Sequence, residues 1–287
     1  MGRPAYDVVL MFKILVLQRL YDLSDAQMEY QVKDRLTFMR FLGFDFLTDV
    51  PDEKTIWNFR EKLKQKGLAR KLFQRFNRLL EEHGYISKPG KIIDASIVEV
   101  PQQRNTREEN AQIREGEVPA QWGKNPNMLA QKDTDARWLK RNGETYYGYK
   151  NHVRIDSKTK LVEEYAVTPA NIHDSQAARD LLTKLPAGAA VYADKAYDVP
   201  EVRALLERRG CLDKIIRKAK RNHPLGSRTL RANRTLSKTR ARVEHVFGDM
   251  EKIGADFLRC VGIARAEVQI ALSNIVYNMR RLSFLAA

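Results

Sequence analysis

Three acidic residues, far apart in the chain, stand where metal ligands are expected. Asp94 ends the apolar run 91–94 and Asp194 ends the run 191–194, and both runs are typical of short buried strands. Glu244 lies in a stretch that predicts a helix, at the border of an apolar stripe. A carboxylate in a buried strand is costly unless it is paired or bound to a metal. The pattern therefore favours divalent metal ions held by two strand carboxylates and one helix carboxylate.

Such a centre is suited to phosphodiester chemistry. Two Mg²⁺ ions can activate an attacking oxygen and stabilise the leaving oxygen. Mg²⁺ takes oxygen ligands and keeps several waters, so a few carboxylates suffice, and we expect Mn²⁺ to substitute for it. The five histidines are scattered and the two cysteines lack metal-ligand spacing, so no soft-metal site competes. For Glu244 a simpler alternative stays open, an ion pair with Arg240 four residues earlier.

The composition indicates a globular protein with a polyanionic partner. The 287 residues are enough for one large domain and a small accessory domain, and 43% of them are hydrophobic. The net charge of +15 favours a nucleic acid as partner. Two cysteines are too few for a disulfide framework, which favours a cytoplasmic protein. The apolar stretch 8–17 contains Lys13 and is too short to span a bilayer, so we expect a buried helix and no membrane partner.

Residues 1–88 predict an all-helical N-terminal domain. We expect helices over 6–20, 25–33, 36–42, 53–66 and 68–84, with Ser24 and Asp52 as N-caps and Gly43 and Gly67 as stops. Short turns between helices allow a helix-turn-helix DNA reader. A helical cap with a solvated basic face is an equally good interpretation of the basic residues Arg60, Lys62, Lys64 and Lys66.

Residues 89–287 predict an α/β domain. Strands are expected over 91–100, 145–155, 161–168, 190–194 and 213–216, with helices over 173–185 and 199–209 and further helices at the end. The two central strands form a hairpin, so the sheet is mixed and flanked by helices. Residues 101–143 are polar and turn-rich, and we interpret them as a long loop or insertion over the site.

The segment 214–242 holds eleven Lys or Arg residues and no Asp or Glu. Such a run is often only a solvated face. Because this run leads directly into Glu244, a nucleic-acid contact is the better interpretation. The residues expected to contact DNA in it are Arg228, Arg231, Arg234 and Lys238.

A series of short motifs runs in a fixed order along nearly the whole chain. The motifs are Gly2-Arg3-Pro4 with Leu10-Met11-Phe12, Pro51-Asp52-Glu53-Lys54-Thr55-Ile56 with Phe59-Arg60, Asp94-Ala95-Ser96-Ile97-Val98, Gly148-Tyr149-Lys150-Asn151-His152, Ala170-Asn171-Ile172-His173-Asp174-Ser175, Ala193-Asp194-Lys195-Ala196-Tyr197 and Arg240-Ala241-Arg242-Val243-Glu244-His245-Val246-Phe247. In this order they resemble bacterial insertion-sequence transposases of the DDE type, in the group named after insertion sequence five.

The resemblance implies a ribonuclease H-like catalytic domain in which Asp94, Asp194 and Glu244 are the catalytic, metal-binding triad. Such enzymes cut transposon ends to free a 3′-hydroxyl and then join that hydroxyl to target DNA. The resemblance also implies that Arg240, like the arginines four residues before the glutamate in these enzymes, contacts DNA. The partner would be double-stranded DNA, both inverted-repeat ends and target. Because two ends must be handled together, we expect a homodimer or higher oligomer on DNA.

The resemblance also gives roles to residues whose pattern alone is ambiguous. Lys150 and His152 share one face of a hairpin strand, which fits either surface exposure or, as the resemblance implies, substrate contacts. His173 and Asp174 are interpreted as a helix start. Tyr197 and Asp198 follow Asp194 closely and are expected to support the site.

Some positions depart from the family pattern. Glu251 stands where a basic residue is usual, Ser237 where a tyrosine often occurs, and relatives commonly have a few dozen residues before Gly2. Two alternatives to an active transposase therefore stay open. One is a truncated or host-adopted DNA-binding protein without full transposition activity, and the other is a metal-dependent DNA nuclease.

Overall fold

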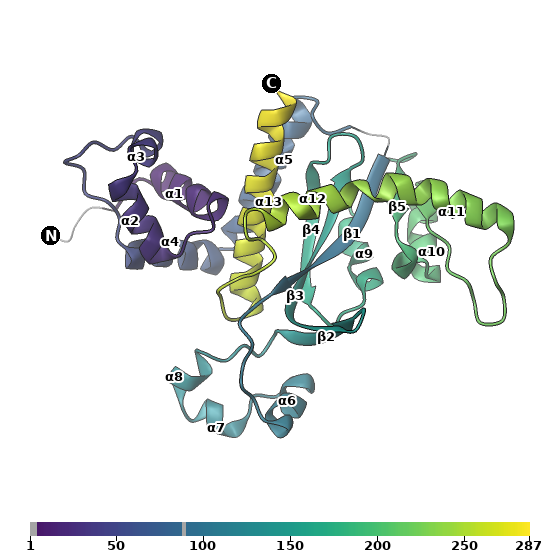
Figure 1. Ribbon diagram of the computed structural model, residues 1–287, viewed down its shortest axis with the longest axis horizontal. Helices are drawn as coiled ribbons and strands as arrows, with labels where there is room; N and C mark the ends of the chain where they lie inside the picture. The colour runs from purple at the N-terminus through teal and green to yellow at the C-terminus, as the bar shows by residue number, and fades with distance from the viewer. Residues whose placement is uncertain (1–4, 88–89) are drawn as a thin grey trace.

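A computed structural model describes residues 5–87 and 90–287 (Figure 1). Residues 1–4 of the first motif and the expected domain boundary at 88 and 89 lie outside the described residues. The N-terminal part consists of helices α1 (Val8–Leu20), α2 (Asp25–Asp34), α3 (Leu36–Leu42), α4 (Glu53–Gln65) and α5 (Leu68–Glu82).

Local signals place the ends of these helices as expected. Ser24 forms a capping box with Gln27 at the start of α2, and the Asp52 carboxylate accepts the backbone N–H of Thr55 at the start of α4. Gly43 ends α3 with a left-handed φ of 80°. The predicted helical N-terminal region is therefore confirmed in its elements.

The sheet is mixed, as predicted. Its strands are β1 (Gly90–Glu99), β2 (Arg137–Arg141), β3 (Glu144–Asp156), β4 (Val162–Pro169), β5 (Ala190–Ala193) and β6 (Leu212–Ile215). β3 pairs antiparallel with β1, β2 and β4, whereas β1, β5 and β6 run parallel to one another. β2 pairs only with the first five residues of β3, so the main order is β4-β3-β1-β5-β6. This arrangement agrees with the ribonuclease H-like fold that the resemblance implies.

Helices cover both faces of the sheet because side chains alternate along β1. Ile93 faces a core that includes residues of α9 (Ala178–Leu181) and α10 (Pro200–Arg208). Ile92 faces a larger core that includes residues of α12 (Arg242–Glu251) and α13 (Ile263–Leu285). α13 contacts α5, α1 and β4, so this core continues from the sheet into the N-terminal helices (Figure 1).

The structure changes two expectations about the catalytic region. The segment 101–143 is not a long loop, since it forms α6 (Arg107–Arg114), α7 (Ala120–Gly123), α8 (Pro126–Leu129) and β2; the alternative, an insertion over the site, stays a prediction. A capping box between Thr106 and Glu109 starts α6, and the fully buried indole of Trp122 donates a hydrogen bond to Glu109, so one aromatic residue organises a polar segment. The helix expected over 173–185 is only a short 3-10 turn, η1 (Asp174–Ala177), followed by α9. α9 ends at Leu181, and Lys184, three residues further on, takes a positive φ of 57° that is not helical.

Within residues 5–87 and 90–287, none of the helices is long and apolar enough to cross a membrane.

Candidate active site

The sheet brings Asp94 and Asp194 to the same place. β1 and β5 are parallel neighbours, with Ile93 opposite Ala193, and each aspartate follows its paired residue directly. β5 stops at Ala193, so the next part of β1 has no partner strand on that side. The Asp194 carboxylate caps the 3-10 turn η2 (Lys195–Tyr197) by accepting the backbone N–H of Ala196 at 2.8 Å. The two aspartates therefore lie at the same level of neighbouring strands, where β5 ends and β1 continues, and the charge of Asp194 acts on Asp94.

Asp94 lies in an acidic and nearly water-free environment. Its burial raises the pKa of this carboxyl to about 6, against the lowering effects of the Ala95 N–H and of Arg240. The charges of Asp194 and Asp174 raise the pKa further. A cation close to Asp94 would relieve this cost, which is the electrostatic condition for a metal ligand.

Tyr197 lies among the same acidic groups. Its side chain is fully buried, and this burial, followed by the charges of Asp94, Asp174 and Asp194, raises its pKa well above the usual range. The phenol is therefore a permanent hydrogen-bond donor, and its hydroxyl has no hydrogen-bond partner among the described residues. This position agrees with the expectation that Tyr197 supports the site.

Glu244 is linked to Asp94 through Arg240. Arg240 ends helix α11 (Ser227–Arg240), and Glu244 lies in the first turn of α12. One guanidinium nitrogen of Arg240, Nη1, donates to Asp94 Oδ2 at 2.6 Å, and the other, Nη2, donates to Glu244 Oε1. The Glu244 side chain is 61% exposed, so it can turn towards the sheet without leaving a core. The ion pair that the sequence offered as an alternative role for Glu244 is thus present.

The donors fit a hard divalent cation. The three predicted ligands are all carboxylates, and oxygen is what Mg²⁺ and Mn²⁺ prefer. A positive group, the Arg240 guanidinium, already stands between two of these carboxylates. In the part of the chain that the structure describes, no three His, Cys, Asp or Glu side chains come close enough to hold a metal ion. The triad therefore stays a prediction whose members are adjacent but not yet assembled.

Lys150 and His152 lie on the face of β3 opposite to Asp94. In the β1–β3 register Asp94 pairs with Val153 whereas Ala95 pairs with His152, so the aspartate and the histidine point to opposite faces. Both residues are buried, which makes the expectation of surface exposure wrong: η1 and α9 lie against this face of β3, and β4 pairs with β3 at its side. Burial lowers the pKa of His152 to about 4, and its Nε2 hydrogen-bonds the hydroxyl of Thr168 at 2.8 Å.

Asp174 is a fourth carboxylate of this neighbourhood, and the sequence pattern assigned it only to a helix start. Lys150 Nζ donates to Asp174 Oδ1 at 2.7 Å and to the carbonyl of Ile172 at 2.8 Å. The charge of Asp174 also acts on Asp94 and Tyr197. Its place in the motif 170–175, beside the motif that contains Lys150, is the signal that could have identified it.

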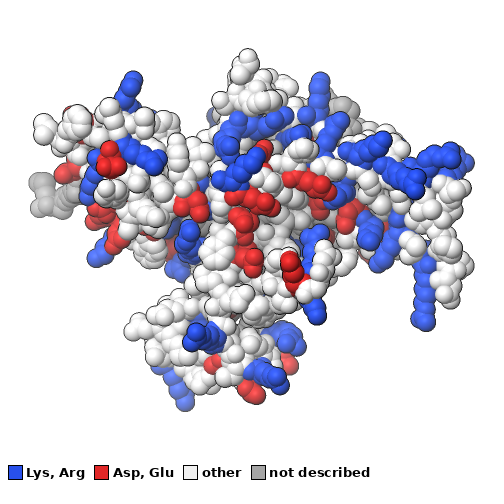
Figure 2. All heavy atoms as spheres, in the orientation of Figure 1, with Lys and Arg blue, Asp and Glu red and all other residues white. Residues whose placement is uncertain are grey.

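α11 presents an exposed basic face. None of its residues is buried, and four basic residues lie within about a third of the helix circumference, at roughly 100° per residue. Asn233 and Arg240 lie on the opposite, inward side, where Asn233 exchanges hydrogen bonds of 3.0 Å with the backbone of Arg217. Figure 2 shows Lys and Arg side chains gathered along this helix. The four residues, which form no ion pair with another described residue, are Arg228, Arg231, Arg234 and Lys238.

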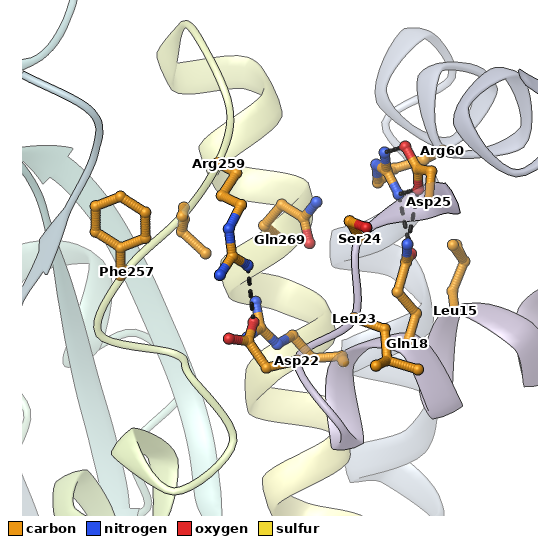
Figure 3. Close-up of a pocket in the computed structure, with 12 residues that line it drawn as sticks. Leu15, Gln18, Asp22, Leu23, Ser24, Asp25, Arg60, Phe257, Arg259 and Gln269 are labelled. Atoms are coloured by element: carbon orange, nitrogen blue, oxygen red, sulfur yellow. Dashed lines mark hydrogen bonds and ion pairs between the residues drawn. The ribbon is translucent and has the colours of Figure 1, made fainter. Parts of the chain in front are cut away.

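The basic residues of the N-terminal helices are partly neutralised. Arg60 makes a two-pronged ion pair with Asp25 at 2.8 and 2.6 Å, and Lys64 pairs with Glu61. A small cavity of about 130 Å³ lies beside the Arg60 pair, where the N-terminal helices meet the segment 257–269 (Figure 3). Arg259 reaches across this junction to Asp22. None of the predicted site residues lines this cavity, and its ion pairs favour a role in holding the two parts together.

Comparison with known proteins defines the class. The family described as "Transposase DDE domain" matches residues 86–279, and "Transposase domain (DUF772)" matches residues 1–62. The chain therefore belongs to the DDE transposases, a family that depends on divalent metal ions.

Among curated proteins, the chain is 38% identical over 198 residues to the "Transposase for insertion sequence element IS1106" of Neisseria meningitidis serogroup B. The aligned region covers 68% of this chain and 65% of that relative, so the chain spans just under two thirds of the relative's length. The predicted resemblance to bacterial insertion-sequence transposases is thereby confirmed, whereas the group named after insertion sequence five stays a prediction.

Two solved structures show weaker likeness. A piggyBac transposase synaptic complex with hairpin DNA gives a TM-score of 0.49 at 11% identity and covers all of this chain and 69% of the other. The Mos1 strand transfer complex gives 0.29 at 12% identity and covers all of this chain and 79% of the other. Neither likeness bears on the chemistry of this chain.

Proposed function

We propose that this chain is a DNA transposase that cleaves transposon ends and joins the freed 3′-hydroxyl to target DNA by two-metal-ion phosphoryl transfer. The observation that carries the proposal is the position of Asp94 and Asp194 directly after paired residues of two parallel strands, with Glu244 tied to Asp94 through Arg240. Asp94, Asp194 and Glu244 would hold Mg²⁺, for which Mn²⁺ can substitute. When bound, such ions activate the attacking oxygen and stabilise the leaving oxygen of a phosphodiester.

The local structure fixes the direction of two of the three proposed ligands and leaves the third free to move. Burial in β1 fixes the direction of the Asp94 carboxylate, and the turn η2 fixes that of Asp194 through the Ala196 N–H. Glu244, on the exposed first turn of α12, is the ligand that can move as substrate enters. Rigid strand carboxylates with one mobile helix carboxylate suit a site that must accept a large DNA substrate.

Double-stranded DNA is the proposed substrate, as inverted-repeat ends and as target. The outward face of α11 would lie along the phosphate backbone, because its four basic residues have no acidic partner among the described residues. We assign residues 1–88 to end recognition and 89–287 to catalysis. Because two ends are processed together, the working form would be a homodimer or a higher oligomer on DNA.

A strand-transfer assay tests the proposal. DNA ending in the terminal inverted repeats of the element, incubated with the protein in Mg²⁺, should yield nicked ends and joined products. Nicking without joining would identify the metal-dependent nuclease instead. Binding without either reaction, in both Mg²⁺ and Mn²⁺, would identify the DNA-binding protein without transposition activity.

A further inference from the structure

Arg240 occupies one of the carboxylate oxygens that the proposed metal centre would use. Both oxygens of Asp94 have partners: Oδ1 accepts the N–H of Ala95 at 2.8 Å, and Oδ2 accepts Arg240 Nη1 at 2.6 Å. The Ala95 bond is local and belongs to the strand, whereas Arg240 comes from 146 residues away. The guanidinium therefore holds the Asp94 oxygen that accepts no hydrogen bond from the strand.

The second prong of the guanidinium holds Glu244, so one monovalent cation joins two of the proposed ligands. An oxygen that accepts a charge-assisted hydrogen bond from one cation is a poorer ligand for a second, because two positive charges then meet at one oxygen. The absence of an assembled metal-ligating group within the described residues agrees with this arrangement.

We propose that Arg240 takes the place of a metal ion between Asp94 and Glu244 in the metal-free protein, and that a DNA phosphate draws Arg240 away, so that DNA and metal binding strengthen each other. This inference rests on the proposed function. A guanidinium leaving two carboxylates needs another anion, and a phosphate accepts its fork in the same two-pronged way. Coupling of this kind is reciprocal: DNA raises the affinity for metal by the same factor by which metal raises the affinity for DNA.

The chain offers a matched control. Arg242 lies two residues further on, has the same charge, and donates only to the carbonyl of Ser157 at 2.8 Å. Replacing Arg240 or Arg242 by Gln therefore removes one positive charge from the same region, but only Arg240→Gln frees Asp94 and Glu244. Arg240→Lys keeps the charge and loses the fork, and so should lie between the wild type and Arg240→Gln.

The test measures Mn²⁺ binding by the full chain without DNA. Electron paramagnetic resonance monitors binding as the loss of the signal of free Mn²⁺. Arg240→Gln should bind Mn²⁺ roughly tenfold more tightly than Arg242→Gln, a factor typical of coupling between sites. The effect of DNA is measured with Ca²⁺ in place of Mn²⁺, by calorimetric titration of Ca²⁺ into the protein with and without inverted-repeat DNA. The DNA should increase the Ca²⁺ affinity of the wild type and have much less effect on that of Arg240→Gln.

Equal Mn²⁺ affinities of the Arg240→Gln and Arg242→Gln variants would overturn the inference. Adding Asp94→Asn to the Arg240→Gln variant separates this failure from failure of the proposed function. If the double variant binds Mn²⁺ more weakly than Arg240→Gln while the two single arginine variants are equal, the metal centre stands and the role of Arg240 is wrong. If the double variant binds Mn²⁺ as tightly as Arg240→Gln, the metal centre itself is wrong.

Discussion

The basic face of α11 can be tested by its salt dependence. From Arg228 to Lys238 the helix rises about 15 Å, which matches about four phosphates of one strand at ~3.4 Å each. Changing Arg228, Arg231 and Arg234 together to Ala should reduce the slope of log affinity against log salt by roughly two to three units, since each neutralised phosphate contributes about 0.9. At 0.1 M salt the same loss amounts to a factor on the order of 10² to 10³ in affinity.

The assay is fluorescence anisotropy with duplex DNA at several salt concentrations, with and without the inverted repeat. A variant with Arg179 of α9, Lys184 after it and Arg208 of α10 changed to Ala loses the same charge from other exposed positions and serves as the control. The control should keep the wild-type slope, and the ratio of specific to non-specific affinity should change little in both variants. An unchanged slope for the α11 variant would make the helix an ordinary solvated face. A collapse of specificity would mean that α11, and not the N-terminal helices, reads the transposon end.

Two further predictions concern stability. Gly148→Ala should destabilise the fold by about 1–3 kcal/mol in urea unfolding, because the new Cβ would lie 2.3 Å from the Val98 carbonyl oxygen, at a residue whose φ is 153°. The control Gly123→Ala has open space around the new Cβ and should not lower the stability. Equal stabilities of the two variants would contradict the close approach of β3 to β1. His152 has a folded pKa of about 4 against 6.5 when unfolded, so between pH 7 and 4 the unfolded chain binds the extra proton and stability falls as the pH is lowered. The wild type should lose roughly 3 kcal/mol more than His152→Gln over this range; parallel losses would mean that His152 titrates normally.

The strand aspartates can be predicted from sequence because their signal is local. Asp94 and Asp194 each end an apolar run, and the parallel β1–β5 register places the two runs side by side, so that the two aspartates come to the same level of the sheet. The meeting of Arg240 with Asp94 cannot be predicted in this way. Helical spacing predicts the pair of Arg240 with Glu244, but the contact with Asp94 depends on how α12 packs on β1.

Sequence alternation also does not predict which face of the hairpin is buried. Alternation predicts that Lys150 and His152 share a face, but whether that face is covered depends on the packing of η1 and α9. The place of Asp174 near the site cannot be predicted for the same reason, since only the fold brings this residue to Lys150. In the fold itself, caps such as Ser24 are predictable, whereas α13 is buried on nearly all sides along its middle and has no amphipathic period to detect.

The most direct test of the central claim is strand transfer by the three carboxylate variants. Asp94→Asn, Asp194→Asn and Glu244→Gln remove a proposed ligand's charge at nearly constant shape. Each should abolish cleavage and joining in Mg²⁺ without weakening binding to inverted-repeat DNA measured in the absence of divalent metal ions, since that binding rests on basic residues. Glu251→Gln, on the same helix as Glu244, is the matched control and should retain activity. Cleavage at close to the wild-type rate by any of the three variants would contradict the assignment of that residue to the metal centre.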